Sequence, residues 1–169
     1  GQLKRICRDM FGLTYEQCYG TNEQKNSLTH IKWEDMAFNN NNKTGYMTAR
    51  EIMEHFGSNV CRRLDNNCWA RACLTTISQS KTFFAVITDC RFPNEVEWVH
   101  KHGGKVIRLD RQVNDKDTMA EKSLDKNIYD WSKFDKVINN AKLTIGQTNE
   151  QVYRTLKQWG FIDEIKEEV

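Results

Sequence analysis

The sequence has one proline, nine glycines and no apolar run near the ~20 residues that cross a bilayer. Nothing near its start has the pattern of a signal peptide, so we expect no membrane partner and a cytoplasmic location, the host's if the protein is viral. No C-x-x-C pair occurs, and the cysteines lie in apolar patterns. We therefore expect reduced thiols and no metal site at Cys7, Cys18, Cys61, Cys68, Cys73 and Cys90.

Charge of one sign is also scarce. The 169 residues carry 25 basic and 23 acidic side chains, a net charge of +2. Such a balance argues against binding nucleic acid by overall charge, so any anion site must be local. A nucleic-acid surface is the less favoured alternative because acidic residues interleave the basic ones; it would use Lys4, Arg5, Arg8, Arg62 and Arg63.

Helical periodicity dominates the first half. Residues 3–11 form a predicted helix ended by Gly12, residues 14–20 a turn, and residues 21–45 a polar loop with an asparagine-rich tip. Thr48 and Glu51 make a capping box for a helix through residue 56. Gly57 then ends that helix, and a longer one starts at Ser58 or Asn59, which predicts a helical hairpin joined at residues 57–58.

The second half alternates strands and helices. Residues 83–87 are apolar and β-rich, which predicts a strand buried on both faces. Helices over 94–102 and 121–129, strands over 105–109 and 134–138, and a final helix capped by Thr148 follow. This order predicts a three-layer α/β domain with a mostly parallel sheet.

Charged residues cluster just after the first predicted strand. Asp89, Arg91 and Glu95 leave its carboxyl end, where open α/β sheets bind ligands, and Pro93 stiffens the turn. A purely structural interpretation stands beside the functional one. In it, Asp89 and Glu95 cap the next helix and Arg91 pairs with one of them.

A second cluster lies in the helical half. Arg50 and Glu54 are four residues apart, so they form either an exposed ion pair or, with the turn at Gly57 and Ser58, a phosphate grip. Trp69 is either a core residue or a platform for a base.

Together these strings resemble a family. Residues 47–62, then Trp69, then residues 87–95 are similar to the bacteriophage deoxynucleoside monophosphate kinases, a branch of the P-loop kinases. Residues 3–5, 11–20 and 134–140 extend the resemblance over almost the whole chain. Glu54 stands where that family favours Gln, and Ser58 where it favours Thr.

The resemblance implies one P-loop-kinase-like domain over residues 1–169. It would comprise a helical monophosphate-binding lobe at about 21–80, a sheet core over 81–169 and a lid near 111–122. The implied reaction is phosphoryl transfer from ATP, with Mg²⁺, to a deoxynucleoside monophosphate.

Site roles follow from the same resemblance. The monophosphate side would be held by Arg50, Glu54, Gly57 and Ser58, and the base would lie near Trp69. Asp89 and Arg91 would meet the reacting phosphates, with Glu95 supporting Arg91. Arg108 on the cofactor side and Arg111 would neutralise the transferring phosphate. Arg50 and Arg91 should then converge on one anion site.

The sequence departs from the family in one serious respect. No segment matches G-x-x-x-x-G-K-S/T, the loop whose backbone and lysine hold the phosphates. The resemblance places that loop's strand between the strands ending at Asp89 and Arg111.

Several alternatives follow from the missing loop. The chain is either part of a longer kinase that supplies the loop or a non-catalytic nucleotide-binding derivative. A homodimer or another chain could also complete the sheet. Residues 83–87 should pair either with residues that precede Gly1 or directly with residues 105–109.

Overall fold

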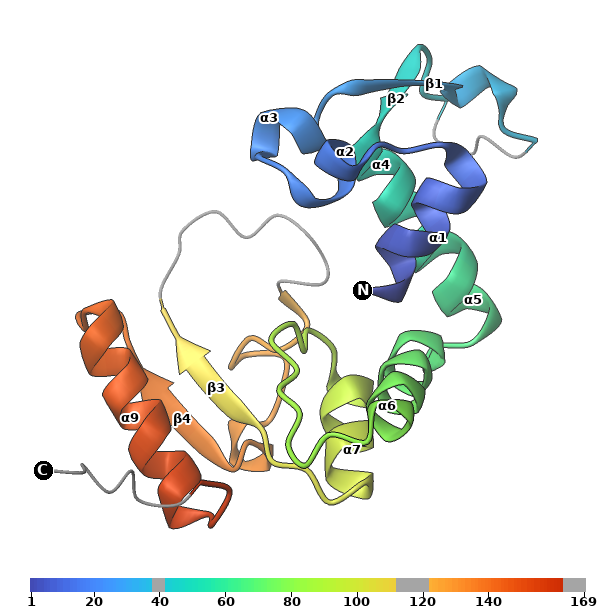
Figure 1. Cartoon of the computed structure of the whole chain (residues 1–169). Helices are drawn as coiled ribbons and strands as arrows, with labels where there is room; N and C mark the ends of the chain where they lie inside the picture. The colour runs from blue at the N-terminus through green and yellow to red at the C-terminus, as the bar shows by residue number, and fades with distance from the viewer. Residues whose placement is uncertain (38–41, 112–121, 163–169) are drawn as a thin grey trace, which may run out of the picture. The chain divides into compact units, whose positions relative to one another are not determined.

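The computed structural model describes residues 1–37, 42–111 and 122–162, and the chain forms two compact units, Gly1–Lys81 and Thr82–Val169 (Figure 1). Most of the asparagine-rich tip and of the expected lid at 111–122 falls outside the described residues.

The first unit opens with three helices: α1 (Gln2–Phe11), α2 (Tyr15–Tyr19) and α3 (Asn22–Lys25). Helix α1 ends as predicted at Gly12, whose φ of 64° is left-handed. The turn predicted over 14–20 is instead largely helical, because Thr14 and Gln17 form a capping box that starts α2. Thr21 starts α3 in the same way.

A small antiparallel sheet replaces much of the predicted polar loop. Strand β1 (Leu28–Lys32) pairs with β2 (Tyr46–Thr48), and the short helix η1 (Trp33–Asp35) follows β1. The Thr29 hydroxyl also donates to the Met47 carbonyl at 2.9 Å. The sequence analysis missed this sheet because its pairing joins residues well apart in the chain.

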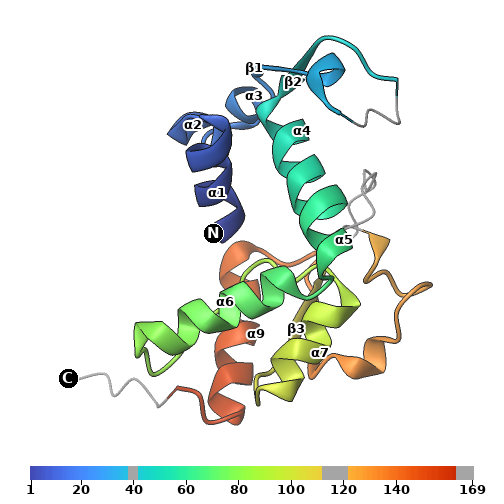
Figure 2. The ribbon, with the colours of Figure 1, turned by 90° about the vertical axis from the view of Figure 1, so that its right-hand side faces the viewer.

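The predicted hairpin at residues 57–58 is wrong. Helix α4 (Ala49–Glu54) runs on through the π-helical turn η2 (His55–Cys61) into α5 (Arg62–Leu64), as Figure 2 shows. The break comes at Asp65, which is extended, before α6 (Cys68–Ser80). Gly57 serves close packing instead, since a Cβ there would lie 3.0 Å from Leu3 Cδ2.

The core of this unit joins all of these elements. Its buried apolar residues come from α1, α2, α4, the small sheet and the segments between them, and the edge-on pair Phe11–Phe56 borders it. They are Cys7, Leu13, Cys18, Trp33, Met47, Ala49 and Ile52.

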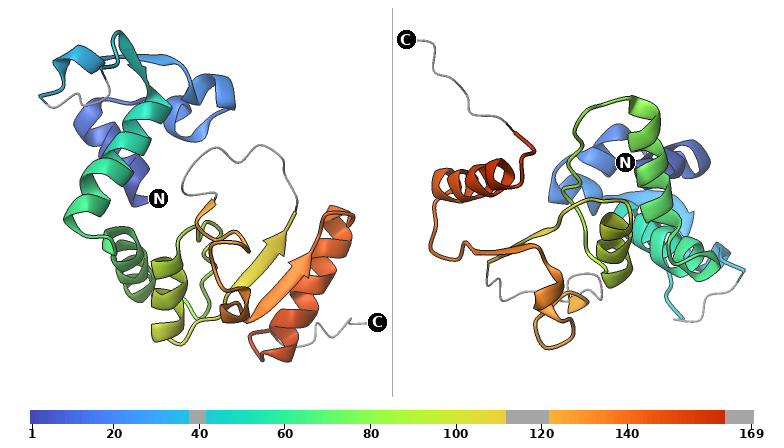
Figure 3. Two further views of the ribbon diagram at one scale, coloured as in Figure 1. Left: turned by 180° about the vertical axis from the view of Figure 1, so that it is seen from behind. Right: turned by 90° about the horizontal axis from the view of Figure 1, so that it is seen from below.

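The second unit contains a parallel strand pair. Its elements are α7 (Pro93–Lys101), β3 (Ile107–Asp110), η3 (Trp131–Lys133), β4 (Lys136–Asn139) and α9 (Ile145–Gln158). Strand β3 pairs in parallel with β4, from Ile107 opposite Lys136 to Asp110 opposite Asn139. Helix α9 lies beside β4 (Figure 3). The α/β class is confirmed, but the described residues form two small sheets and not one three-layer sheet.

The strand predicted over 83–87 is wrong for the described residues. Phe83 is fully exposed and Val86 is 69% exposed. Within the described ranges, no backbone hydrogen bond joins Ala85 or Val86 to another strand, and β3 pairs with β4 alone. Neither predicted partner of this segment is therefore in place. An apolar, β-prone run becomes a strand only when another strand completes its hydrogen bonds.

Two further predictions in this unit need correction. The described part of the helix expected over 121–129 consists mainly of turns. Helix α9 is capped by Thr144 with Gln147, and Thr148 lies buried inside the helix, donating to the Thr144 carbonyl at 3.0 Å. Within the described ranges, no helix is both long and apolar enough to span a membrane.

The Asp135 carboxylate fixes the start of the parallel pair. It accepts from the Val106 backbone N–H at 2.8 Å, from Lys105 Nζ at 3.0 Å and from His100 Nε2 at 2.8 Å. Burial disfavours its charged form, but these contacts outweigh burial and hold the pKa of Asp135 below its ordinary value of 3.8.

We predict that Asp135→Asn destabilises the second unit by about 1–2 kcal/mol at pH 6, because the charged acceptor is lost. A lowered pKa stabilises the fold above the ordinary value, and this stabilisation disappears as the pH falls below about 4. The difference between variant and wild type should therefore shrink by pH 3 in urea unfolding. Glu150→Gln, which breaks an exposed pair with Arg154, should cost no more than about 0.5 kcal/mol. A difference independent of pH would contradict the argument.

Candidate phosphate-binding site

Arg91 lies in the loop that leads into α7. Its Nε donates to the Asp89 carboxylate, and both side chains are largely exposed. Such an exposed pair contributes little to stability, about 0–1 kcal/mol. The contact therefore orients the Arg91 guanidinium more than it stabilises the fold.

Glu95 holds the backbone of the same loop. One carboxylate oxygen accepts from the Arg91 N–H at 2.8 Å and from the Phe92 N–H at 3.1 Å. Phe92 has no side-chain acceptor, so only the glutamate half of a capping box forms. Glu95 thus supports Arg91 through the main chain, and this capping agrees with the structural interpretation of its role. Asp89 pairs with Arg91, as that interpretation also allowed.

Cys90 lies between the two charged residues but points toward the core of the unit. Burial, reinforced by the carboxylates of Glu95 and Asp89, raises the pKa of its thiol to about 12. The thiol is consequently protonated at neutral pH and is not a nucleophile.

Arg108, on β3, is mostly buried, with 20% of its side chain exposed. Its guanidinium lies 5.3 Å from the centre of the Trp131 ring, and Nη2 is 3.8 Å from Asp125 Oδ1, a loose ion pair. Its Nε is buried without a hydrogen-bond partner among the described residues. Arg111, just beyond β3, is exposed.

Arg50 does not pair with Glu54 in the part of the chain described. Its Nε donates to Asn26 Oδ1 at 2.9 Å and its Nη2 to Asn22 Oδ1 at 3.1 Å, which ties α4 to α3. Neutral amides orient the guanidinium but leave its positive charge uncompensated. Glu54 is exposed.

Gly57, Ser58 and Trp69 meet the helix rather than a tight turn. Gly57 is buried in the π-helical turn, Ser58 is exposed, and the Trp69 indole N–H donates to the Gly57 carbonyl at 3.0 Å. Trp69 is half-buried, so the structure gives it a packing role. Single π-turns inside α-helices often mark functional sites.

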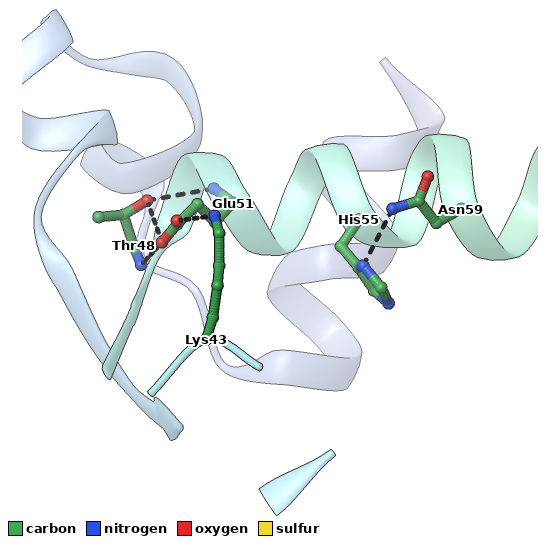
Figure 4. A network of polar contacts seen from close by, with 5 residues as sticks. All are labelled: Lys43, Thr48, Glu51, His55 and Asn59. Carbon is green, nitrogen blue, oxygen red and sulfur yellow. Dashed lines mark hydrogen bonds and ion pairs between the residues drawn. The ribbon is translucent and has the colours of Figure 1, made fainter. Parts of the chain in front are cut away.

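A polar network fixes the start of α4, which carries Arg50 (Figure 4). Glu51 accepts from the Thr48 N–H at 3.0 Å and pairs with Lys43 at 3.0 Å, confirming the predicted capping box. Burial opposes the charge, but these contacts prevail and lower the pKa of Glu51. One helical turn on, His55 Nδ1 and Asn59 Nδ2 are 3.1 Å apart.

The two groups of arginines belong to different units. Arg50 lies in the first unit, and Arg91, Arg108 and Arg111 in the second. Their expected convergence stays a prediction. The analysis of the sequence missed Asn22, Asn26, Ser123 and Asp125, which contact the arginines, because all four lie in polar stretches without a motif.

The second unit combines a parallel strand pair with arginines near its carboxyl edge, an arrangement typical of phosphate-binding α/β proteins. A family model for deoxynucleotide monophosphate kinase matches residues 4–146. The chain therefore belongs to the deoxynucleotide monophosphate kinase family.

One curated relative gives the same indication. A protein of Acanthamoeba polyphaga mimivirus named "Putative deoxynucleotide monophosphate kinase" is 29% identical over 124 residues, covering 64% of this chain. The match covers 56% of that relative, so the chain spans about half of its length. No solved structure matches the chain.

We predict that Glu95→Ala destabilises the second unit by about 1–2 kcal/mol, because the Arg91 and Phe92 N–H groups lose their acceptor. Glu95→Gln is the matched control: its amide oxygen still accepts, so it should lose less than half as much. Thermal unfolding and hydrogen exchange at residues 91 and 92 measure both effects. Equal losses in the two variants would contradict the capping role.

Proposed function

We propose that the protein transfers a phosphoryl group from ATP to a deoxynucleoside monophosphate, giving the diphosphate, once a phosphate-gripping loop is supplied. Family membership over residues 4–146 carries this proposal. Arg50, Gly57 and Ser58 would serve the monophosphate, and Arg91, with Arg108 and Arg111, the reacting phosphates.

The state of Arg50 supports a role in binding anions. An arginine paired with a carboxylate must give up that partner to bind a phosphate, whereas Arg50 is oriented by two amide oxygens. Its planar fork matches phosphate in two parallel hydrogen bonds. Glu54 lies one turn away without pairing to it, so it would weaken a bound phosphate only by repulsion.

Magnesium would enter with the nucleotide. The described residues include no group of three His, Cys, Asp or Glu side chains suited to a metal. A nucleotide-bound Mg²⁺ needs only one or two protein carboxylates, since phosphates and water supply its other ligands. The exposed Asp89 carboxylate fits that requirement.

The alternative function is a non-catalytic nucleotide-binding or regulatory derivative. The specific observation behind it is that the sequence has no G-x-x-x-x-G-K-S/T loop. The two functions share a monophosphate site and differ in turnover.

We predict no ATP-dependent turnover by the 169-residue chain with any of the four common deoxynucleoside monophosphates, because nothing else in the sequence supplies the backbone cradle and its lysine. A coupled ADP-release assay tests this. The chain should then be assayed together with any residues encoded upstream of Gly1. Turnover by that longer protein supports the kinase, and nucleotide binding without turnover supports the non-catalytic derivative.

We predict that Arg50→Gln weakens binding of the preferred deoxynucleoside monophosphate about tenfold or more in calorimetry, because a charged hydrogen-bonding partner is lost. Arg50→Lys should bind at an intermediate level, since it keeps the charge but not the fork. Glu54→Gln should bind at least as tightly as wild type. Melting temperatures control for the lost contacts to α3, and unchanged affinity in both arginine variants would remove Arg50 from the site.

A further inference from the structure

The main chain of Arg91 is held on both sides. Its N–H donates to Glu95 at 2.8 Å, and its carbonyl accepts from the Ser123 hydroxyl at 2.8 Å. Ser123 is 32 residues further along the chain, so this hydrogen bond joins two distant segments of the second unit. The peptide groups before and after Arg91 therefore each have a fixed partner.

The segment that carries Ser123 is itself anchored. Leu124 is 3% exposed and belongs to the core with Val96 and Val106. Its carbonyl accepts from the Trp131 indole N–H at 2.9 Å. Ser123 thus acts from a rigid position, because the next residue is buried and hydrogen-bonded.

The same short segment reaches a second arginine. Asp125 Oδ1 lies 3.8 Å from Arg108 Nη2, and Arg108 packs over the ring of Trp131. Three consecutive residues, 123–125, therefore contact Arg91 through its carbonyl and Arg108 through its guanidinium. Neither contact is visible in the sequence pattern around Asp89, Arg91 and Glu95.

We propose that Ser123 is a positioning residue, which fixes the backbone of Arg91 so that its guanidinium meets a phosphate group of the nucleotide. The inference rests on the proposed function, because it takes Arg91 as a phosphate-binding residue. Ordering a backbone costs conformational entropy. When the loop is ordered before the ligand arrives, that cost no longer weakens binding.

This role differs from a purely structural hydrogen bond in one measurable way. A structural bond affects only the stability of the fold, whereas a positioning bond also affects the affinity of Arg91 for phosphate in the folded protein. Affinity measured well below the melting temperature separates the two.

The test uses inorganic tripolyphosphate without metal as the probe and the full 169-residue chain. The ¹H–¹⁵N signal of Arg91 Nε, assigned by its loss in Arg91→Gln, reports binding at this one side chain. We expect Ser123→Ala to raise the dissociation constant roughly five- to tenfold. Ser123→Thr keeps the hydroxyl and should stay within about twofold of wild type. Ser132→Ala, an exposed serine in the same unit, should change nothing.

The outcomes separate this inference from the proposed function. If tripolyphosphate shifts Arg91 Nε equally in wild type and Ser123→Ala, the positioning role is wrong while Arg91 keeps its proposed part. Equal weakening in the alanine and threonine variants would also overturn it, because the hydroxyl would not be responsible. If Arg91 Nε does not respond in wild type, the role of Arg91 in the proposed function fails as well. Circular dichroism confirms that each variant is folded.

Discussion

One carboxylate, that of Glu95, determines what the loop before α7 can do. Two backbone N–H groups at the start of a helix need an acceptor, and Phe92 cannot provide one. By satisfying both, Glu95 sets the path of the chain at Arg91. The guanidinium is then left to the exposed carboxylate of Asp89. A structural cap and a phosphate-binding loop are therefore compatible here: the cap uses the backbone, and the side chain stays accessible.

The sequence predicted local chemistry well. The capping box of Thr48 with Glu51 and the left-handed Gly12 need only neighbouring residues, so a short pattern identifies them. The strands near 105–109 and 134–138 were found for a similar reason, since each is a short apolar run close to a turn signal. The pairing of β3 with β4 then requires only the connection between them to fold back.

Long-range partners could not be predicted. Gly57 has the spacing of a helix end, but its function is close approach to Leu3, more than fifty residues earlier. Residues 83–87 have the composition of a buried strand, yet no described strand pairs with them. In the site, Asn22, Asn26 and Ser123 look like ordinary loop residues. Each acquires its role only when folding brings an arginine within hydrogen-bond distance.

The kind of partner that holds each arginine has a consequence for binding. Arg91 is oriented by a carboxylate, so a phosphate must displace or share that partner. Arg50 is oriented by neutral amides and keeps its full charge, which favours an incoming anion without competition. Arg108 is between these cases, because its ion pair with Asp125 is long and its Nε has no partner among the described residues. The carboxylates of Asp89 and Asp125 would thus act as stand-ins for phosphate, holding Arg91 and Arg108 near their working geometry at the cost of some affinity.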